Sequence, residues 1–440
     1  MLNKNCIWLL ILAVGAALLL GAGCPFPGPG PDPDPGPGPG PGPDPDPDPD
    51  PDPDPDPEPF LNIVKTDVEM RSDAKLLCGD DLIVFGTGML NGVSYIVPSE
   101  TPTVGTPVPN DAVFRSKSFA VAKRTIFLVD GMFQVSVFNV DEDVAPATIP
   151  EADLRLANIP AGAKDAGHLQ ADGDYCVVRC DGGNVIRVID VSGGAPVILP
   201  LTNPPDVTTG FGVQQVAIDA ASMRVIAAAG NPRALYVYDL NNPADAPAAI
   251  ALPNDISNNV QMKVNGNFLV ALDDQAYKQL LLVDLEAGEI VELAEANAIA
   301  DVAVGPDAFA FFADLDADDS VGGDRRAAAG ALPGPDFAKA ALGNQIDGST
   351  NNNGLVGFAG SMCIVPAGDY AGYLFLANSY LQYSPGGVAF TVPADPDGDD
   401  PWACPAWDVD ASRNTVGFKT ATTRSDNTET TVGYIILEND

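Results

Sequence analysis

The chain has 440 residues, of which 60 are Asp or Glu and 22 are Lys or Arg, and its formal net charge is −38. So acidic a chain is unsuited to binding nucleic acid, because phosphate contacts need a basic surface, and to docking on anionic lipid by charge. Its single histidine excludes histidine-rich metal sites and any mechanism that needs two imidazoles.

Residues 1–23 have the layout of a secretory signal peptide, with Lys4 near the start, an apolar run over Ile7–Leu20 and small residues before Cys24. The run has 14 residues, whereas a membrane-spanning helix needs about 20. LLLGAGC, residues 18–24, resembles the lipobox of bacterial lipoproteins, although Gly21 stands where leucine is usual. The resemblance implies a lipid on Cys24. Plain secretion and a retained anchor helix are the alternatives.

Residues 24–59 form a proline-rich segment that we expect to be a disordered linker. Proline occupies every odd position from 25 to 59 and alternates mainly with Gly and Asp. Because proline lacks a backbone donor and restricts the residue before it, this tract can form neither helix nor sheet. A polyproline II-like strut of this length spans up to about 110 Å at roughly 3.1 Å per residue.

The remaining residues, 60–440, keep 50 acids and 21 bases after the ten acids and one base of the first 59 residues are set aside. Their pattern is one of short apolar strands and turns. One phrase recurs, an apolar strand that ends in Asp and a turn. Its strong copies are VSVFNVDED (135–143), IRVIDVSGG (186–194), LYVYDLNNP (235–243) and LLLVDLEAG (280–288). Their anchors, spaced by 49, 49 and 45 residues, are Asp141, Asp190, Asp239 and Asp284.

Further strands accompany this phrase. Weaker copies occupy 92–100, 354–361, 387–395 and 432–440. Partner strands precede the strong copies at 125–131, 175–180, 225–230 and 268–274, and candidate first strands lie at 213–219 and 260–264. The segments 195–201 and 288–294 could supply a fourth strand. Four short strands in each period of 45–49 residues are typical of a β-propeller in which one period is one blade.

We therefore predict an all-β fold, a β-propeller of four-stranded blades over residues 60–440. Eight blades are favoured, because eight copies average about 48 residues each. Seven is the alternative, because the sixth unit is irregular: clear strands at 299–304 and 308–314 are followed by a long stretch rich in Asp, Gly, Ala and Asn. Residues 60–67 could pair with the last blade and remove an exposed sheet edge.

Two of these units support a family resemblance. IRVIDVSGGAPVI (186–198) and LYVYDLNNPADAPAA (235–249) resemble the repeats of LVIVD-type, WD40-like β-propellers. The copies at 135–143 and 280–288 lack the proline that follows in the better matches. The resemblance implies the propeller fold and a surface or secreted bacterial protein, but no particular chemistry.

Two acidic clusters are candidate calcium sites. From residue 314 onward, carboxylates alternate as they do at positions 1, 3 and 5 of a calcium loop, although glycine and glutamate are missing at positions 6 and 12. A shorter cluster begins at residue 395. The candidate ligands are Asp314, Asp316, Asp318, Asp395, Asp397 and Asp399. Calcium is the one cofactor that the sequence suggests, and solvated acidic loops are the alternative.

The other reactive side chains favour structural roles. Cys176 and Cys180 lie about 13 Å apart along one predicted strand, so they should not pair. Cys363 and Cys404 could form a disulfide, and buried thiols are the default for these residues and for Cys78. We expect His168 to be structural as well. The sequence has no nucleophile elbow, phosphate-binding loop or dinucleotide-binding glycine motif in a suitable context.

These features predict an extracytoplasmic lipoprotein, anchored in the outer membrane or at the cell surface, or facing the periplasm. Its propeller would be a monomeric, non-enzymatic scaffold that binds a protein, glycan or small ligand. A calcium-dependent propeller hydrolase or lactonase is the alternative, because carboxylates at a channel mouth can hold calcium and activate water. A purely structural envelope protein is the third reading. Convergence of three or more Asp, Glu or Asn side chains at the channel mouth would favour the enzyme.

Overall fold

A computed structural model describes residues 61–437, which belong to one compact unit, Pro59–Asp440. Short segments inside this range are not described: 73, 88–91, 100, 106–113, 131–134, 143–146, 150–167, 181–184, 200, 203–212, 231–232, 253–259, 274–278, 296–297, 315–324, 333–345, 348–360, 379, 386–405 and 425–426. In the described part of the chain, no helix is long and apolar enough to cross a membrane.

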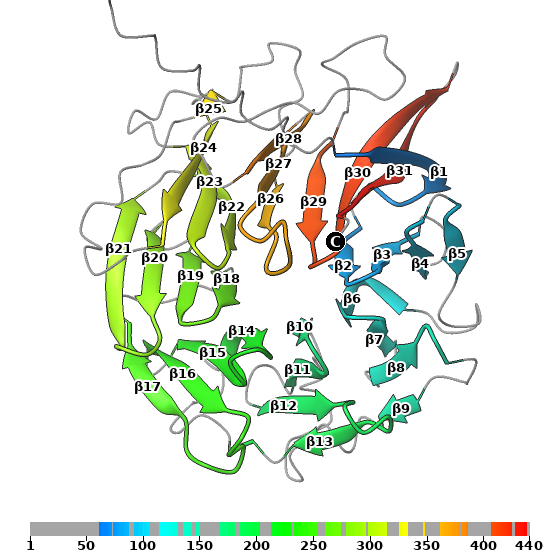
Figure 1. The fold of residues 1–440 in the computed structure, drawn as a ribbon. Helices are drawn as coiled ribbons and strands as arrows, with labels where there is room; N and C mark the ends of the chain where they lie inside the picture. The colour runs from blue at the N-terminus through cyan, green and yellow to red at the C-terminus, as the bar shows by residue number, and fades with distance from the viewer. Residues whose placement is uncertain are drawn as a thin grey trace, which may run out of the picture. The chain divides into compact units, whose positions relative to one another are not determined.

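The described strands form eight antiparallel sheets arranged around a ring, the blades of a β-propeller (Figure 1). Blade 1 contains β2 (Leu76–Gly79), β3 (Leu82–Gly86), β4 (Val93–Val97) and β5 (Thr103–Gly105). Blade 2 contains β6 (Phe114–Ala122), β7 (Thr125–Asp130), β8 (Val135–Asn139) and β9 (Ala147–Ile149). Blade 3 contains β10 (His168–Asp172), β11 (Tyr175–Cys180), β12 (Val185–Asp190) and β13 (Val197–Leu199). Blade 4 contains β14 (Val213–Asp219), β15 (Arg224–Gly230), β16 (Arg233–Asp239) and β17 (Ala248–Ala251).

The second half of the ring continues in the same order. Blade 5 contains β18 (Val260–Asn265), β19 (Phe268–Asp273), β20 (Gln279–Asp284) and β21 (Glu289–Glu295). Blade 6 contains β22 (Ala298–Val304), β23 (Ala308–Asp314), β24 (Arg325–Ala331) and β25 (Ile346–Asp347). Blade 7 has three described strands, β26 (Ser361–Ile364), β27 (Leu374–Asn378) and β28 (Tyr380–Ser384). Blade 8 contains β29 (Asp408–Ala411), β30 (Thr415–Arg424), β31 (Asn427–Ile436) and β1 (Ile63–Glu69).

The ring is closed by β1, which confirms the prediction for residues 60–67. In Figure 1 the blue β1 lies beside the red β31, and the two strands pair antiparallel with Ile63 opposite Ile435. The buried Thr66 hydroxyl also donates a 2.7 Å hydrogen bond to the carbonyl of Val432. The first described strand therefore covers the edge of β31 with backbone hydrogen bonds, so the last blade is not left with an open edge.

The core is divided among the interfaces between blades. Eight apolar clusters of buried residues are present in the described part of the chain, and each joins two neighbouring blades. Phe127 of blade 2 packs with Val178 of blade 3, and Ile83 of blade 1 packs with Tyr434 of blade 8. Every blade thus buries both faces. This is why the sheets need large apolar residues on successive positions rather than strict alternation with polar ones.

The recurrent phrase of the sequence is the third strand of a blade, and its anchor residue caps the turn that follows. The side chains of Asp190, Asp239 and Asp284 each accept a hydrogen bond from the amide two residues later, at 2.8, 2.9 and 2.9 Å. Such Asx turns satisfy the backbone locally. In blade 2 the equivalent anchor is Asn139 rather than the predicted Asp141, because Asn139 pairs with Thr125 at the start of β7 and caps the amide of Asp141 at 3.0 Å.

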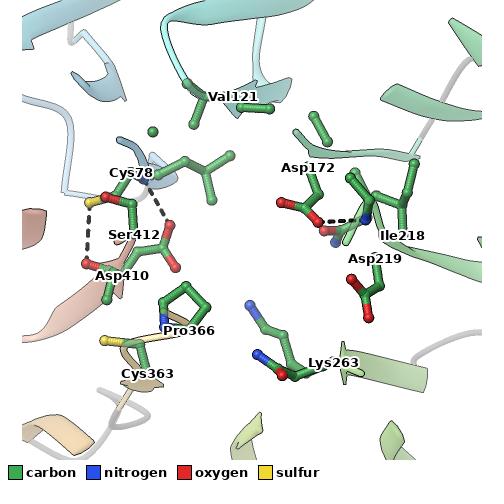
Figure 2. A pocket seen from close by; sticks show the side chains of 18 of the residues that line it. Cys78, Val121, Asp172, Ile218, Asp219, Lys263, Cys363, Pro366, Asp410 and Ser412 are labelled. Atoms are coloured by element: carbon green, nitrogen blue, oxygen red, sulfur yellow. Dashed lines mark hydrogen bonds between the residues drawn. The ribbon is translucent and has the colours of Figure 1, made fainter. Parts of the chain in front are cut away.

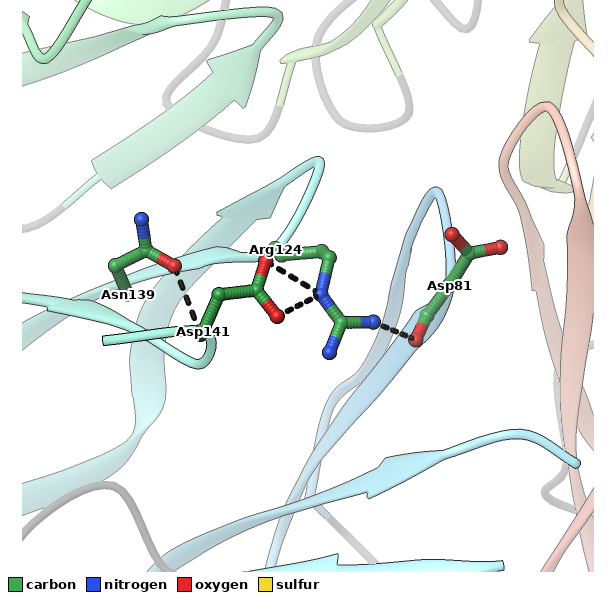
Figure 3. A network of polar contacts seen from close by, with 4 residues as sticks. All are labelled: Asp81, Arg124, Asn139 and Asp141. Atoms are coloured by element: carbon green, nitrogen blue, oxygen red, sulfur yellow. Dashed lines mark hydrogen bonds and ion pairs between the residues drawn. The ribbon is translucent and has the colours of Figure 1, made fainter. Parts of the chain in front are cut away.

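Asp141 has a different role, which Figure 3 shows. Its carboxylate accepts hydrogen bonds from the Arg124 side chain at 2.7 and 2.8 Å. The same guanidinium donates to the backbone carbonyl of Asp81 in blade 1 at 3.3 Å. Asp141 therefore holds an arginine that links blades 1 and 2.

The irregular sixth unit was interpreted wrongly from the sequence. The third strand of blade 6 is β24, whose sequence is RRAAAGA, and not the segment 354–361. Ser361 instead begins the first strand of blade 7. Blade 6 meets blade 7 through Ala303, Ala310 and the half-buried Ala329, so this interface does not demand the large apolar side chains by which the other third strands are recognised. Residues 354–360 and 387–395 lie outside the described residues.

Gly79 tests how tightly neighbouring blades approach. A Cβ at this position would fall on the backbone carbonyl oxygen of Lys123, in the first turn of blade 2. Because backbone at a blade interface cannot move aside cheaply, we expect Gly79→Ala to lower the free energy of unfolding by about 2 kcal/mol or more in urea titrations. Gly193→Ala is the matched control, since nothing lies within 4 Å of its added Cβ, and it should change stability by less than about 0.5 kcal/mol. Equal stability of the two variants would contradict this packing.

Candidate functional site

The first strands of the eight blades surround a central channel that contains a cavity of about 530 Å³. This volume lies within the range of small-molecule sites. The lining comes from these strands and from the turns that connect them to the second strands (Figure 2). Both charged and apolar side chains reach the cavity, because the first strand of a blade has a free edge toward the channel. No residue of this cavity was singled out from the sequence as a ligand-binding residue.

Aspartates near the mouth of the channel bind the neighbouring blade rather than pointing together. Asp172, at the end of β10, accepts a 2.7 Å hydrogen bond from the amide of Ala220 in blade 4 (Figure 2). Asp219, at the end of β14, accepts a 2.7 Å hydrogen bond from the amide of Gly266 in blade 5. Each of these carboxylates therefore satisfies a turn amide of the next blade.

The same device recurs deeper in the channel. Asp301 of β22 accepts hydrogen bonds from the amide of Met362 and the hydroxyl of Ser361 in blade 7, at 2.9 and 3.1 Å. Asp410 of β29 accepts a 2.8 Å hydrogen bond from the amide of Cys78 in blade 1. Four of the eight junctions between blades are thus held by an aspartate of one first strand and a backbone amide of the next blade. We call these four residues the seam aspartates.

Burial makes the charged form of three seam aspartates unfavourable. It raises the pKa of Asp172 and Asp410 above the usual range, although hydrogen bonds from backbone amides oppose the rise. The pKa of Asp301 is raised to about 6, again by burial first, while Lys263 and the amides of Met362 and Val302 oppose it. The carboxylates of the channel are therefore costly charges that the backbone and two lysines, Lys263 and Lys75, only partly compensate.

Two lysines line the channel in the same region. Figure 2 shows the Lys263 side chain with its amine directed toward the open centre. Burial lowers the pKa of Lys75 to about 8, with further lowering by Lys263, while Asp410, Asp408 and Cys176 oppose the shift. Burial acts on Lys263 in the same direction, but Asp410 and Asp301 outweigh it and raise the Lys263 pKa. A third carboxylate, Asp408, is bound by Lys419 at 2.8 Å.

The described cysteines are buried thiols. Cys78 and Cys363 line the channel, and the Cys78 thiol donates to the backbone carbonyl of Asp410 at 3.2 Å. Cys363 is a free thiol, so it does not form the disulfide considered with Cys404. Cys176 is free as well, which agrees with the prediction that it does not pair with Cys180 on β11. Burial raises the pKa of Cys78, Cys176 and Cys363, which makes these thiols poor nucleophiles.

The remaining sequence candidates are not tested by the described residues. Asp314 ends β23, and His168 begins β10, but their side chains are not described. Cys24, Cys404, Asp316, Asp318, Asp395, Asp397 and Asp399 lie outside the described residues. Within the described part of the chain, no three His, Cys, Asp or Glu side chains are grouped so as to hold a metal ion.

Comparison with known proteins supports the fold alone. No protein family model matches the chain, and no curated protein matches it. Among solved structures, the computationally designed protein Ika8 is 10% identical with a TM-score of 0.51, over 86% of this chain and 99% of Ika8. BamB from Moraxella catarrhalis is 10% identical over 86% of this chain and 99% of its own, with a TM-score of 0.46. The WD40 β-propeller domain of Doa1 is 10% identical over 86% and 97%, with a TM-score of 0.42. The TM-scores of BamB and Doa1 are below 0.5, so we draw no conclusion from these two similarities.

Asp301 predicts a pH dependence of stability. Because its pKa in the folded protein is raised to about 6 from 3.8, the folded state is favoured when this group is neutral and loses stability as pH rises through 6. Asp301→Asn cannot ionise and avoids this loss. The free energy of unfolding of the variant minus that of the wild type should therefore increase by up to about 3 kcal/mol between pH 4 and pH 7. Urea titrations at several pH values measure this difference.

The control for this experiment is Asp307→Asn, at an exposed position in the turn after β22. Substitutions at exposed positions usually change stability by less than about 0.5 kcal/mol, so this variant should stay close to the wild type in every titration. A constant difference for Asp301→Asn would contradict the buried, costly charge at position 301.

Proposed function

We propose that this chain is an extracytoplasmic lipoprotein whose propeller is a non-enzymatic binding scaffold. Residues 1–23 are the signal peptide, Cys24 carries the lipid, residues 24–59 are the linker, and residues 60–440 are the propeller with LVIVD-like units. The lipobox-like sequence before Cys24 and the proline tract after it support the anchor and the spacer. The closed ring of blades supports a rigid scaffold, because each blade is fixed on both faces by its neighbours.

One observation carries the choice of a scaffold over a calcium-dependent hydrolase. The seam aspartates turn toward backbone amides of neighbouring blades, while lysines face the cavity. A calcium-activated water needs several carboxylate or carbonyl oxygens around one point, and ammonium groups beside that point would repel the ion. The channel therefore suits the binding of a ligand better than the activation of water by a divalent cation.

Affinity capture tests the scaffold. The purified protein serves as bait for an envelope extract, and both retained proteins and retained small molecules are identified by mass spectrometry. We expect a specific ligand to be retained and to be recovered unchanged after prolonged incubation. Calcium-dependent cleavage of ester or lactone substrates by the same preparation would contradict the proposal.

The lipid anchor makes a separate prediction. Cys24→Ala should move the protein from the membrane fraction to the soluble extracytoplasmic fraction, because the acyl chains at this residue supply the membrane affinity. Cys6→Ala is the matched control, since this cysteine precedes the apolar run of the signal peptide and should leave the fractionation unchanged. Membrane association of the Cys24→Ala variant would contradict lipidation.

A further inference from the structure

The channel carries a layer of charged groups below its mouth. Lys75 lies just before β2, five residues ahead of the turn at Asp80. Lys263 lies within β18, three residues ahead of the turn at Gly266. At about 3.3 Å per residue this places both lysines roughly 10–16 Å along the strands from the turns. Blades 1 and 5, which supply these lysines, lie opposite each other in the ring of eight. Lys263 nevertheless contributes to the lowered pKa of Lys75, so the two ammonium groups are close enough to interact across the channel.

The carboxylates of this layer attract Lys75 and Lys263 from a distance, but their direct contacts are with other partners. Lys419 binds Asp408, and backbone amides bind Asp301 and Asp410. Among the described residues, neither Lys75 nor Lys263 has a hydrogen bond or an ion pair within 4 Å. Each ammonium group presents three donors. Both lysines are partly exposed and line the cavity, so their ammonium groups are open to an acceptor on a ligand.

Apolar side chains form part of the cavity wall. Val121 of β6, Leu169 of β10 and Ile218 of β14 line it from blades 2, 3 and 4, where Gln170, Asp172 and Asp219 line it as well. Figure 2 shows Ile218 across the channel from Asp410 and close to Asp219, with Val121 on a third side. A ligand in the channel can touch these apolar groups while an ammonium group lies on either side. Asp301, Asp408 and Asp410 lie in the same layer and repel any anion, so the two lysines can compensate at most a single added negative charge.

We propose that the channel binds a small organic monocarboxylate, whose oxygens accept hydrogen bonds from Lys75 and Lys263 and whose apolar body lies on Val121, Leu169 and Ile218. This inference rests on the proposed scaffold function and specifies the chemical class of its ligand. Charge-assisted hydrogen bonds to a carboxylate supply the orientation, and burial of the apolar body supplies much of the affinity.

The proposal predicts a characteristic pH dependence. The pKa of Lys75 in the unoccupied channel is about 8, and the groups that act on it are Lys263, Asp410, Asp408 and Cys176. A bound carboxylate favours the charged lysine, so it raises the Lys75 pKa, and binding above pH 8 takes up a proton. Asp301, whose pKa is about 6, also acts on Lys263, so its ionisation should lower the affinity modestly between about pH 5 and pH 7. Above pH 8 the affinity should fall further, by up to about tenfold per pH unit.

Calorimetric titration of the purified protein with hexanoate tests the proposal. Hexanol provides the same apolar body without the charge, and inorganic phosphate provides an anion without the apolar body. We expect hexanoate to bind at least about tenfold more tightly than either. Lys263→Met should weaken hexanoate binding about tenfold or more, and Lys75→Met should remove the loss of affinity above pH 8. Lys65→Met, at an exposed position of β1, should leave both unchanged.

Several outcomes would overturn the proposal. These are the absence of hexanoate binding at millimolar concentration, equal binding of hexanol or phosphate, and unchanged hexanoate affinity in Lys263→Met. Thermal unfolding of each variant checks that the propeller is intact. The change from Lys to Met removes the charge while keeping most of the side-chain volume. If the affinity capture retains a specific ligand while hexanoate fails to bind, the scaffold function stands and the carboxylate site falls. If hexanoate is bound and calcium-dependent hydrolysis is found, the scaffold function falls and the site stands.

Discussion

The packing of each blade against two neighbours is the constraint on which the rest of this structure depends. A four-stranded sheet with two apolar faces is unstable alone, because both faces would meet water. The eight apolar clusters between blades remove all of these faces from water at once, and β1 closes the ring through its pairing with β31. A closed ring must leave an axis that no blade fills. The channel is thus a consequence of the way the core is divided.

Closure also decides which groups face the channel. The first strands have free edges at the axis, so their polar side chains either satisfy the next blade or remain available to a ligand. The seam aspartates bind backbone amides of the next blade, whereas Lys75 and Lys263 remain available to a ligand. This division leaves two lysines without a direct ion pair to a described residue, in a cavity whose lining holds as many aspartates as basic side chains. The net acidity of the chain therefore does not by itself describe its centre, where Lys75 and Lys263 are available to an anion.

Much of the fold could be predicted because its signals are local. Third strands combine successive large apolar residues with an Asx turn, and residues 190, 239 and 284 show both within a few positions. Asn139 caps its turn as the aspartates do. The hydrogen bond is therefore the same in blade 2, although the residue type is different. The alanine-rich β24 gave no such signal, since its interface needs little side-chain volume.

The candidate site could not be predicted for the opposite reason. Asp410 and Cys78 are 332 residues apart in the chain, yet the Cys78 amide nitrogen lies 2.8 Å from an Asp410 carboxylate oxygen. The sequence around either residue therefore gives no sign of this contact. A lysine in a strand such as Lys263 has the same sequence context whether it faces solvent or a channel. The sequence drew attention instead to acidic clusters in loops, where alternation imitates a calcium site.

The titration of Lys75 in the intact protein, followed by NMR of labelled lysine side chains, tests the central claim most directly. The resonance is assigned by its absence in Lys75→Met. We expect a pKa near 8 without added ligand and a clear rise when hexanoate is added. A pKa at the ordinary lysine value of 10.5, unmoved by hexanoate, would contradict a buried ammonium group that awaits an anion.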